Sequence, residues 1–299
     1  MCAAAPEIKR AGVTCNRLEE RPVIDLTNRD YAVVLLEDID LEAQLAAVRG
    51  LLRRNAEADA ALAGEIREIA TRVGEASGEF GMQLENDWVD HLHGSVFQDA
   101  AHSMSAVGML VPMLESLLTA TFAAIRDLAH PAVPVRPSGA RAAYIGDANF
   151  WNPHYVFGRK RGSRDIARGV VQLADSTGLL PLLPGDFAMV ADALFTYRNR
   201  MFHHGFEWPK PERAKFEELI VERGWPPDWF SRSTSGGEPW IIYMSDTLIR
   251  HSLALIDAIL EGIGIFVQAR YPHLATASQR PGTTRGQFGI AGERWNPIS

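Results

Sequence analysis

The stretch DFAMVADALFTYRNRMFHHG, residues 186–205, decides the fold class of this chain and carries its candidate functional residues. Asp186 suits the N-cap of a helix and Gly205 suits its end, so the stretch between them predicts one helix of about five turns. On a helical wheel with Phe187 at zero, apolar side chains gather within about 60° and form a stripe that faces a core. They are Val190, Ala191, Leu194, Met201 and Phe202. Similar periodicity recurs along the chain and predicts an all-α fold.

Helical periodicity divides the chain into four expected regions. They are a partly ordered N-terminal arm (1–36), a long amphipathic helical segment (37–79), a helical domain (80–271) and a flexible C-terminal tail (272–299). We expect a helical bundle with a long N-terminal helical hairpin, kinked near Gly108 and Pro112. Segments 130–162 and 225–240 are rich in Pro, Gly and aromatic residues and predict irregular loops.

The composition indicates a soluble globular protein of a reducing compartment. Thirty Lys and Arg face 37 Asp and Glu, a net charge of −7, so any contact with nucleic acid must be a local basic patch. Cys2 and Cys15 are the only cysteines and predict no disulfide framework. The apolar run 106–125 contains Pro112 and Glu115 and predicts a core helix, with a membrane-associated protein as the less favoured alternative. We therefore expect a cytoplasmic protein without a membrane partner.

No motif in the sequence indicates a cofactor or a metal. One group of acidic residues and histidines lacks the Glu and Glu-x-x-His pattern of di-iron bundles, and a polar helix face explains it better. This group is Asp87, Asp90, His91, His93 and His102. Nucleophile elbows and phosphate-binding glycine loops are also absent from the sequence.

Arg198 stands at about 20° on the helical wheel, where an apolar side chain would be usual. A guanidinium there needs a carboxylate, a subunit interface or an anion-binding pocket, because an unpaired buried charge is costly. Glu115 is the expected partner, since it is the only charge in the run 106–125.

Asn199 and His203 are four residues apart, so they lie one above the other on the neighbouring helix face. An imidazole in this position can take or give a proton. His204 is an alternative acid or base, and an ordinary helix end with two histidines is the structural alternative.

The run Arg198-Asn199-Arg200-Met201-Phe202-His203 resembles the Arg, polar residue, variable residues, His signature of the HEPN family. The resemblance covers about residues 80–271. It implies a helical bundle, commonly a dimer, and in many members a metal-independent endoribonuclease of toxin, abortive-infection or other antiviral defence systems; other members keep the fold without catalysis. It also raises the expectation of a neutralising or regulatory protein partner.

The resemblance implies a role for each residue of the motif. His203 would act as general base on the 2′-hydroxyl of RNA, Arg198 would stabilise charge on the phosphoryl oxygens, and Asn199 would orient the imidazole or the phosphate. The product would carry a 2′,3′-cyclic phosphate. Arg198 and His203 lie about 140° apart on a regular helix, so we expect two copies to meet across a two-fold axis.

The stretch FWNPHYVFGRKRGSRDIAR, residues 150–168, mixes aromatic and basic side chains in the way that RNA-binding surfaces do. The candidate RNA-binding residues are Trp151, Tyr155, Arg159, Lys160, Arg161 and Arg164. A solvated basic loop whose aromatic residues anchor it to the bundle is an equally good interpretation. For the whole protein, the alternative to a ribonuclease is a non-catalytic helical scaffold that binds a protein or RNA through the same surface.

Overall fold

The computed structural model describes residues 26–128, 138–158 and 163–272. Helices hold 72% of these residues, so the expected all-α class is confirmed. The helices are α1 (Asn28–Leu35), α2 (Leu41–Glu75), α3 (Gly78–Leu128), α4 (Ile166–Thr177), α5 (Phe187–His204), α6 (Lys210–Glu222) and α7 (Asp246–Arg270), with short 3-10 turns η1 (Ala142–Tyr144) and η2 (Leu180–Leu182). The strands are β1 (Tyr155–Val156), β2 (Ser163–Arg164), β3 (Phe230–Ser235) and β4 (Glu238–Met244), which form two antiparallel pairs.

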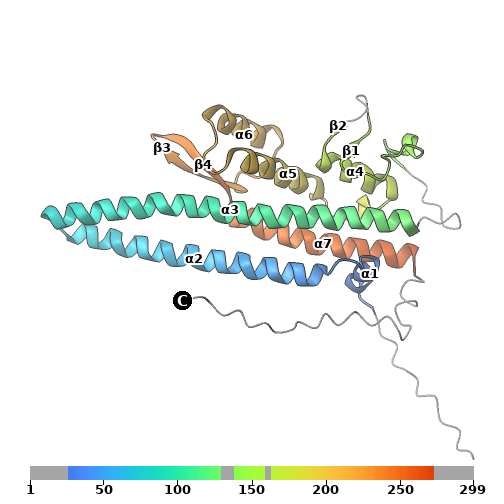
Figure 1. Ribbon diagram of the computed structural model, residues 1–299, viewed down its shortest axis with the longest axis horizontal. Coiled ribbons are helices and arrows are strands. Elements are labelled where there is room, and N and C mark those ends of the chain that lie inside the picture. Colours follow the sequence, from blue (N-terminus) through green and yellow to red (C-terminus); the bar gives the residue numbers. More distant parts are fainter. Residues whose placement is uncertain (1–25, 129–137, 159–162, 273–299) are drawn as a thin grey trace, which may run out of the picture.

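A long hairpin of α2 and α3 forms the base of the molecule, and α7 packs beside it (Figure 1). The remaining elements lie on the other side of α3, with α5, α6 and the β3–β4 pair at one end and α4 with β1–β2 at the other. The hairpin agrees with the sequence pattern. α3 continues as one helix through Gly108 and Pro112, where the sequence suggested a kink. Buried Val111 and Met113 on either side of the proline hold this part of α3 in the core.

Among the described helices, α3 and α7 are long and apolar enough to cross a membrane by length and composition. In the most apolar 18-residue stretch of each helix, 50% of α3 and 56% of α7 is buried inside the fold. Core helices of soluble proteins pass the same test, so these helices are weak evidence for a membrane span. Residues 106–125 form the core segment that the sequence predicted.

Residues 28–35, inside the region expected to be a partly ordered arm, form α1. Thr27 caps this helix, because its hydroxyl accepts from the Asp30 amide at 3.2 Å while the Asp30 carboxylate accepts from the Thr27 amide at 2.8 Å. α1 lies directly on α7, where a Cβ on residue 264 would stand 1.7 Å from the Asn28 carbonyl oxygen. Only glycine fits at Gly264. The helix has two turns, which is too short for a sustained period in the sequence.

The segment 225–240, expected to be an irregular loop, contributes β3 and the start of β4. Gly236 and Gly237, both with positive φ, make the turn between the two strands. Phe230 at the start of β3 is buried against the ring of Phe216 on α6, with ring centroids 5.0 Å apart. The hairpin thus covers an aromatic cluster beside α5.

One buried arginine fixes the irregular segment 138–158 to α4. Arg141 is fully buried and donates to the carbonyl oxygens of Gly169 at 2.9 Å, Asn149 at 3.1 Å and Asn152 at 2.6 Å. Its guanidinium lies 5.0 Å from the ring centre of Phe157. Burial lowers the pKa of Arg141 to about 10, so the side chain stays charged at neutral pH.

Candidate functional site

α5 is held against α3 and β4 by a buried hydroxyl network around Tyr197. The Tyr197 hydroxyl lies 2.8 Å from the Ser103 hydroxyl and donates to the carbonyl oxygen of Ile242 at 3.1 Å. The Ser103 hydroxyl in turn accepts from the Met244 amide at 2.7 Å. Burial raises the pKa of Tyr197 well above its usual range, so the phenol stays a donor. The rotation of α5, and with it the position of Arg198, is therefore fixed by the core.

Arg198 forms the ion pair that the sequence predicted. Its Nη2 lies 3.2 Å from Oε2 of Glu115 on α3. The Arg198 side chain is 33% exposed, so it stands at the edge of the buried stripe and not at its centre. Its Nε is buried and has no hydrogen-bond partner among the described residues. A third of the guanidinium side chain thus faces solvent while it is held by one carboxylate.

His154 completes this cluster from a distant part of the chain. Its Nε2 lies 3.3 Å from Oε1 of Glu115, so one carboxylate stands between an arginine and a histidine. His154 was not among the candidate residues. No local signal in the sequence distinguishes it, because its place depends on how Arg141 folds residues 138–158 onto α4.

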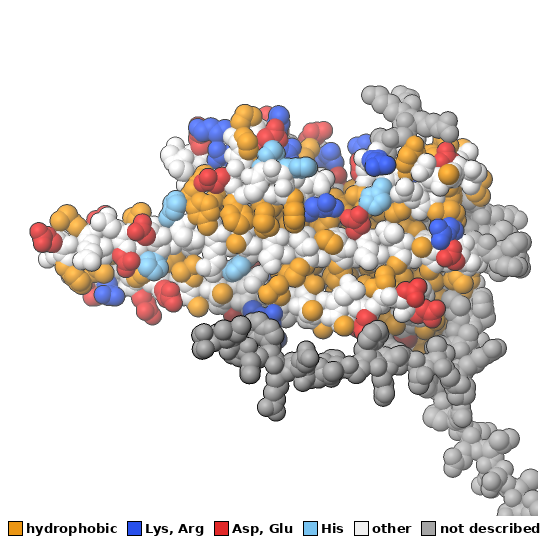
Figure 2. All heavy atoms as spheres, in the orientation of Figure 1, with side chains coloured by type: hydrophobic (Ala, Val, Ile, Leu, Met, Phe, Trp, Pro, Cys, Tyr) orange, Lys and Arg blue, Asp and Glu red, His pale blue; other side chains and the backbone are white. Residues whose placement is uncertain are grey.

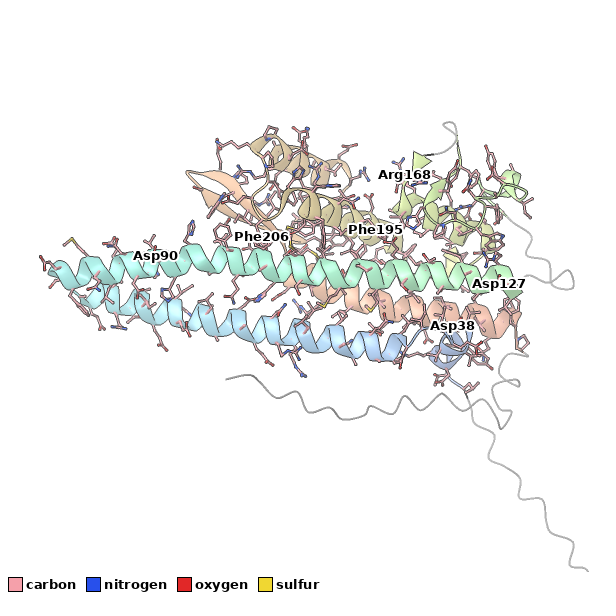
Figure 3. The ribbon with its side chains drawn as sticks, in the orientation of Figure 1. Asp38, Asp90, Asp127, Arg168, Phe195 and Phe206 are labelled. Atoms are coloured by element: carbon pink, nitrogen blue, oxygen red, sulfur yellow. The ribbon has the colours of Figure 1, made fainter. Side chains whose placement is uncertain are left out.

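Arg198, Glu115 and His154 line an open cleft of about 840 Å³ along α3. The other lining side chains include Pro112, Ala120 and Phe202, and most of the wall is apolar. Figure 2 shows this face, where a band of hydrophobic side chains along α3 and α5 adjoins cationic, anionic and histidine side chains. In Figure 3, α5 with Phe195 and α4 with Arg168 flank this region above α3. The volume suits a small molecule or one or two residues of a polymer.

Asn199, His203 and His204 lie on α5 outside the cleft. All three are exposed, and their side chains form no hydrogen bond to the described residues. The rings of His203 and His204 are 6.5 Å apart. Arg198 and His203 therefore do not converge within one chain, which agrees with their separation on the helical wheel.

The candidate RNA-binding stretch is described only in part, since Arg159, Lys160 and Arg161 lie outside the described residues. Trp151 packs edge-on against Phe150 at 5.2 Å, and Tyr155 lies 5.2 Å from the ring of Phe157. Both aromatic side chains are half-buried, as anchors of a loop would be. Arg164 is exposed.

A second pocket of about 320 Å³ lies between α2, α3, the β3–β4 pair and the start of α7. His102 Nδ1 lies 2.7 Å from the Asp59 carboxylate. Burial and the charge of Asp59 raise the pKa of Asp99, while a hydrogen bond from Tyr243 opposes this shift. Burial and Asp99 together raise the pKa of Tyr243 to about 12. In the described part of the chain, no group of three His, Cys, Asp or Glu residues could hold a metal ion.

Replacing Asp99 with asparagine is expected to stabilise the protein at pH 7. The raised pKa means that the folded state binds the proton of Asp99 more tightly than the unfolded state does. The protonated carboxyl therefore adds to the free energy of unfolding below about pH 3.9, and this stabilisation is lost as the pH rises through the raised pKa. Asp99→Asn removes the charge and keeps an oxygen for Tyr243. Thermal melts should show an increase in Tm of about 2 °C at pH 7 and a smaller one at pH 4. An equal or larger increase at pH 4 would contradict the electrostatic origin.

No family model, curated protein or solved structure matches this chain. The membership of the HEPN family remains a prediction from the motif on α5.

Proposed function

We propose that this protein is a HEPN-like, metal-independent endoribonuclease that acts as a homodimer. The observation that carries the proposal is the placement of Arg198, which is fixed by the core and partly exposed in an open cleft. A cation at such a position suits the binding of a phosphate group. The proposed setting is a cytoplasmic toxin, abortive-infection or other antiviral defence system, with a neutralising or regulatory protein as a further partner.

The proposed reaction uses the nucleophile that RNA itself supplies. His203 takes the proton of the 2′-hydroxyl, the oxygen attacks the adjacent phosphorus, and the 5′-oxygen of the next nucleotide leaves with a proton. Arg198 stabilises the negative charge on the phosphoryl oxygens, and Asn199 orients the imidazole or the phosphate. His204 is the alternative acid or base. The products are a 2′,3′-cyclic phosphate and a 5′-hydroxyl.

A second copy of the chain would bring the two halves of the site together. Arg198 opens into the cleft, while His203 stands on an exposed face of the same helix. If the α5 helices of two protomers packed together about a two-fold axis, His203 of one protomer would lie near Arg198 of its partner. The exposed side chain of Phe202, which precedes His203 and lines the cleft with Arg198, would be covered in such a dimer.

The proposal is tested by incubating single-stranded and structured RNA with the full chain in EDTA. We expect cleavage, 2′,3′-cyclic phosphate ends and a dimer by light scattering. Cleavage that requires a divalent ion, or products with a 3′-hydroxyl, would exclude the proposed reaction. The absence of cleavage by a well-folded dimer would favour the scaffold.

A non-catalytic scaffold is the second candidate function. The specific observation in its favour is that Arg198 already has a carboxylate partner while Asn199 and His203 lie outside the cleft. The mostly apolar cleft would then bind a segment of a protein or RNA partner, and the exposed histidines would have no chemical role.

Replacing Glu115 with glutamine tests whether Arg198 binds the phosphate groups of RNA. In the ribonuclease, the carboxylate competes with phosphate for Arg198, so Glu115→Gln is expected to tighten RNA binding by about three- to tenfold, or roughly 0.7–1.4 kcal/mol. Fluorescence anisotropy with a labelled RNA measures this change. Exposed Glu57→Gln, on the distal part of α2, is the matched control. Weaker binding by Glu115→Gln would mean that the carboxylate is needed to hold Arg198 in place.

A further inference from the structure

The distal part of the α2–α3 hairpin carries almost no core. We call residues 57–97 the arm; it comprises the end of α2, the connection and the start of α3. Leu84 is the only buried residue among its described side chains. Figure 1 shows that the outer part of the arm runs on past α7 and past the β3–β4 pair, which contacts the arm only at its inner end, at His93 and Phe97. The outer faces of these helices are therefore open to a further helix.

The arm also concentrates the charge of the protein. Residues 57–97 contain nine carboxylates and two arginines, a net charge of −7. The whole chain has the same net charge of −7, so the rest of the sequence is neutral as a whole. Figure 3 labels Asp90 on this part of α3. The potential around the arm is therefore strongly negative, and a bound partner must be positively charged.

Exposed apolar side chains follow one face of α3 within the arm. Met82, Val89 and Leu92 are separated by seven and three residues, which places them within about 80° on the helix. They are 60%, 52% and 38% exposed. Phe80 near the connection is also exposed. These four are half of the large exposed apolar residues in the described part of the chain, so the arm is their main location.

Three rings, from two residues of α3 and one of β4, lie in contact at the inner end of this apolar stripe. His93, the next residue after Leu92, has its ring centre 5.0 Å from that of Trp240 on β4, and Phe97 lies 5.4 Å from the same ring. Trp240 is held by a hydrogen bond of 2.8 Å to Glu207. A helix that lies along the stripe would therefore have a defined end point, at the β3–β4 pair.

We propose that the arm is a docking site for a basic amphipathic helix of a partner protein. Its apolar side would cover Met82, Val89 and Leu92 on α3, and its Lys and Arg residues would face the carboxylates of the arm. The charge of the arm opposes the other occupants. RNA and anionic lipid are repelled, and a second copy would place one arm of charge −7 against another.

The test uses the full chain and synthetic helical peptides of 18 residues labelled with fluorescein. The probe has Leu at helical spacing on one side and Lys on the other. One control peptide has the same composition in scrambled order, and another has Glu in place of Lys. Anisotropy in about 150 mM salt is expected to show binding of the probe at least tenfold tighter than that of either control. Equal binding of the scrambled peptide would overturn the proposal, because charge alone would then explain it.

Variants locate the binding on the arm. Met82→Gln and Val89→Gln are each expected to weaken the probe about five- to tenfold without a change in Tm, because both side chains are exposed. Ile145→Gln is the matched control, since Ile145 is 60% exposed and lies outside the arm. An effect of Ile145→Gln equal to that of Val89→Gln would overturn the proposal. Two further results would overturn the proposal. If Val89→Gln abolished a homodimer, the apolar stripe would bind a second copy of the chain, and if it abolished binding to phosphatidylcholine vesicles, the stripe would bind lipid.

Discussion

His203→Ala is expected to slow RNA cleavage by at least about 100-fold and to leave the fold intact. The imidazole is exposed and makes no hydrogen bond to the described residues, so its removal leaves no buried group without a partner. Initial rates with a labelled RNA and thermal melts of the same preparations measure the two effects. His91→Ala is the matched control, because His91 is a partly exposed histidine of α3 whose ring bonds only within its own helix.

Mixing two inactive variants tests whether the site is shared between protomers. Arg198→Ala and His203→Ala each lack one component of the proposed site. If Arg198 of one protomer works with His203 of its partner, a heterodimer of the two variants keeps one complete site. After random exchange, half of the dimers are heterodimers, and each of these has one complete site where a wild-type dimer has two. The mixture should therefore cleave RNA at about a quarter of the wild-type rate. No recovery in a mixture with proven exchange would place both residues of a site in one chain.

Arg141→Met is expected to lower the free energy of unfolding by about 3–5 kcal/mol, the largest loss of stability among the changes considered. The guanidinium satisfies three backbone carbonyl groups, at Gly169, Asn149 and Asn152. Methionine fills the space but removes all three charged hydrogen bonds, so the carbonyl groups of Asn149 and Asn152 keep only the backbone amides of Asn152 and Tyr155 as donors. Urea unfolding followed by circular dichroism measures the change.

Two further substitutions define the cause of this loss. Arg168→Ala removes an exposed arginine from neighbouring α4 and should change stability by less than about 0.5 kcal/mol. Arg141→Lys keeps the charge but cannot reach all three carbonyl groups, so it should cost an intermediate amount. If Arg141→Met were no more harmful than Arg168→Ala, residues 138–158 would not depend on this side chain. The position of His154, two residues beyond Asn152, would then need another explanation.

Local signals made part of this structure predictable. α5 begins at Phe187 and ends at His204, the bounds expected from Asp186 and Gly205, because such signals are encoded within a few residues. The Asp186 side chain makes no cap hydrogen bond, however, and its carboxylate lies 2.6 Å from Nε2 of His251. The pairing of Arg198 with Glu115 followed from the cost of an unpaired charge near a core. Both inferences required only the residue types and the geometry of one helix.

The parts that were missed depend on distant contacts. β3 and β4 pair across Gly236 and Gly237, but the many Gly, Pro and aromatic residues nearby hid the alternating pattern of the strands. α1 is helical because α7 buries it, and its own eight residues give a weak signal. His154 reaches Glu115 only when residues 138–158 are folded onto α4, which no spacing in the sequence indicates.

Pro112 gives the cleft a chemical property that its side chains do not reveal. Proline has no amide hydrogen, so the carbonyl oxygen of Gly108, four residues earlier, lacks its usual helical donor. Gly108 and Pro112 both line the cleft. The wall of the cleft therefore includes one turn of α3 with a backbone carbonyl group that the helix itself does not satisfy, beside Arg198, which offers a donor for an anion.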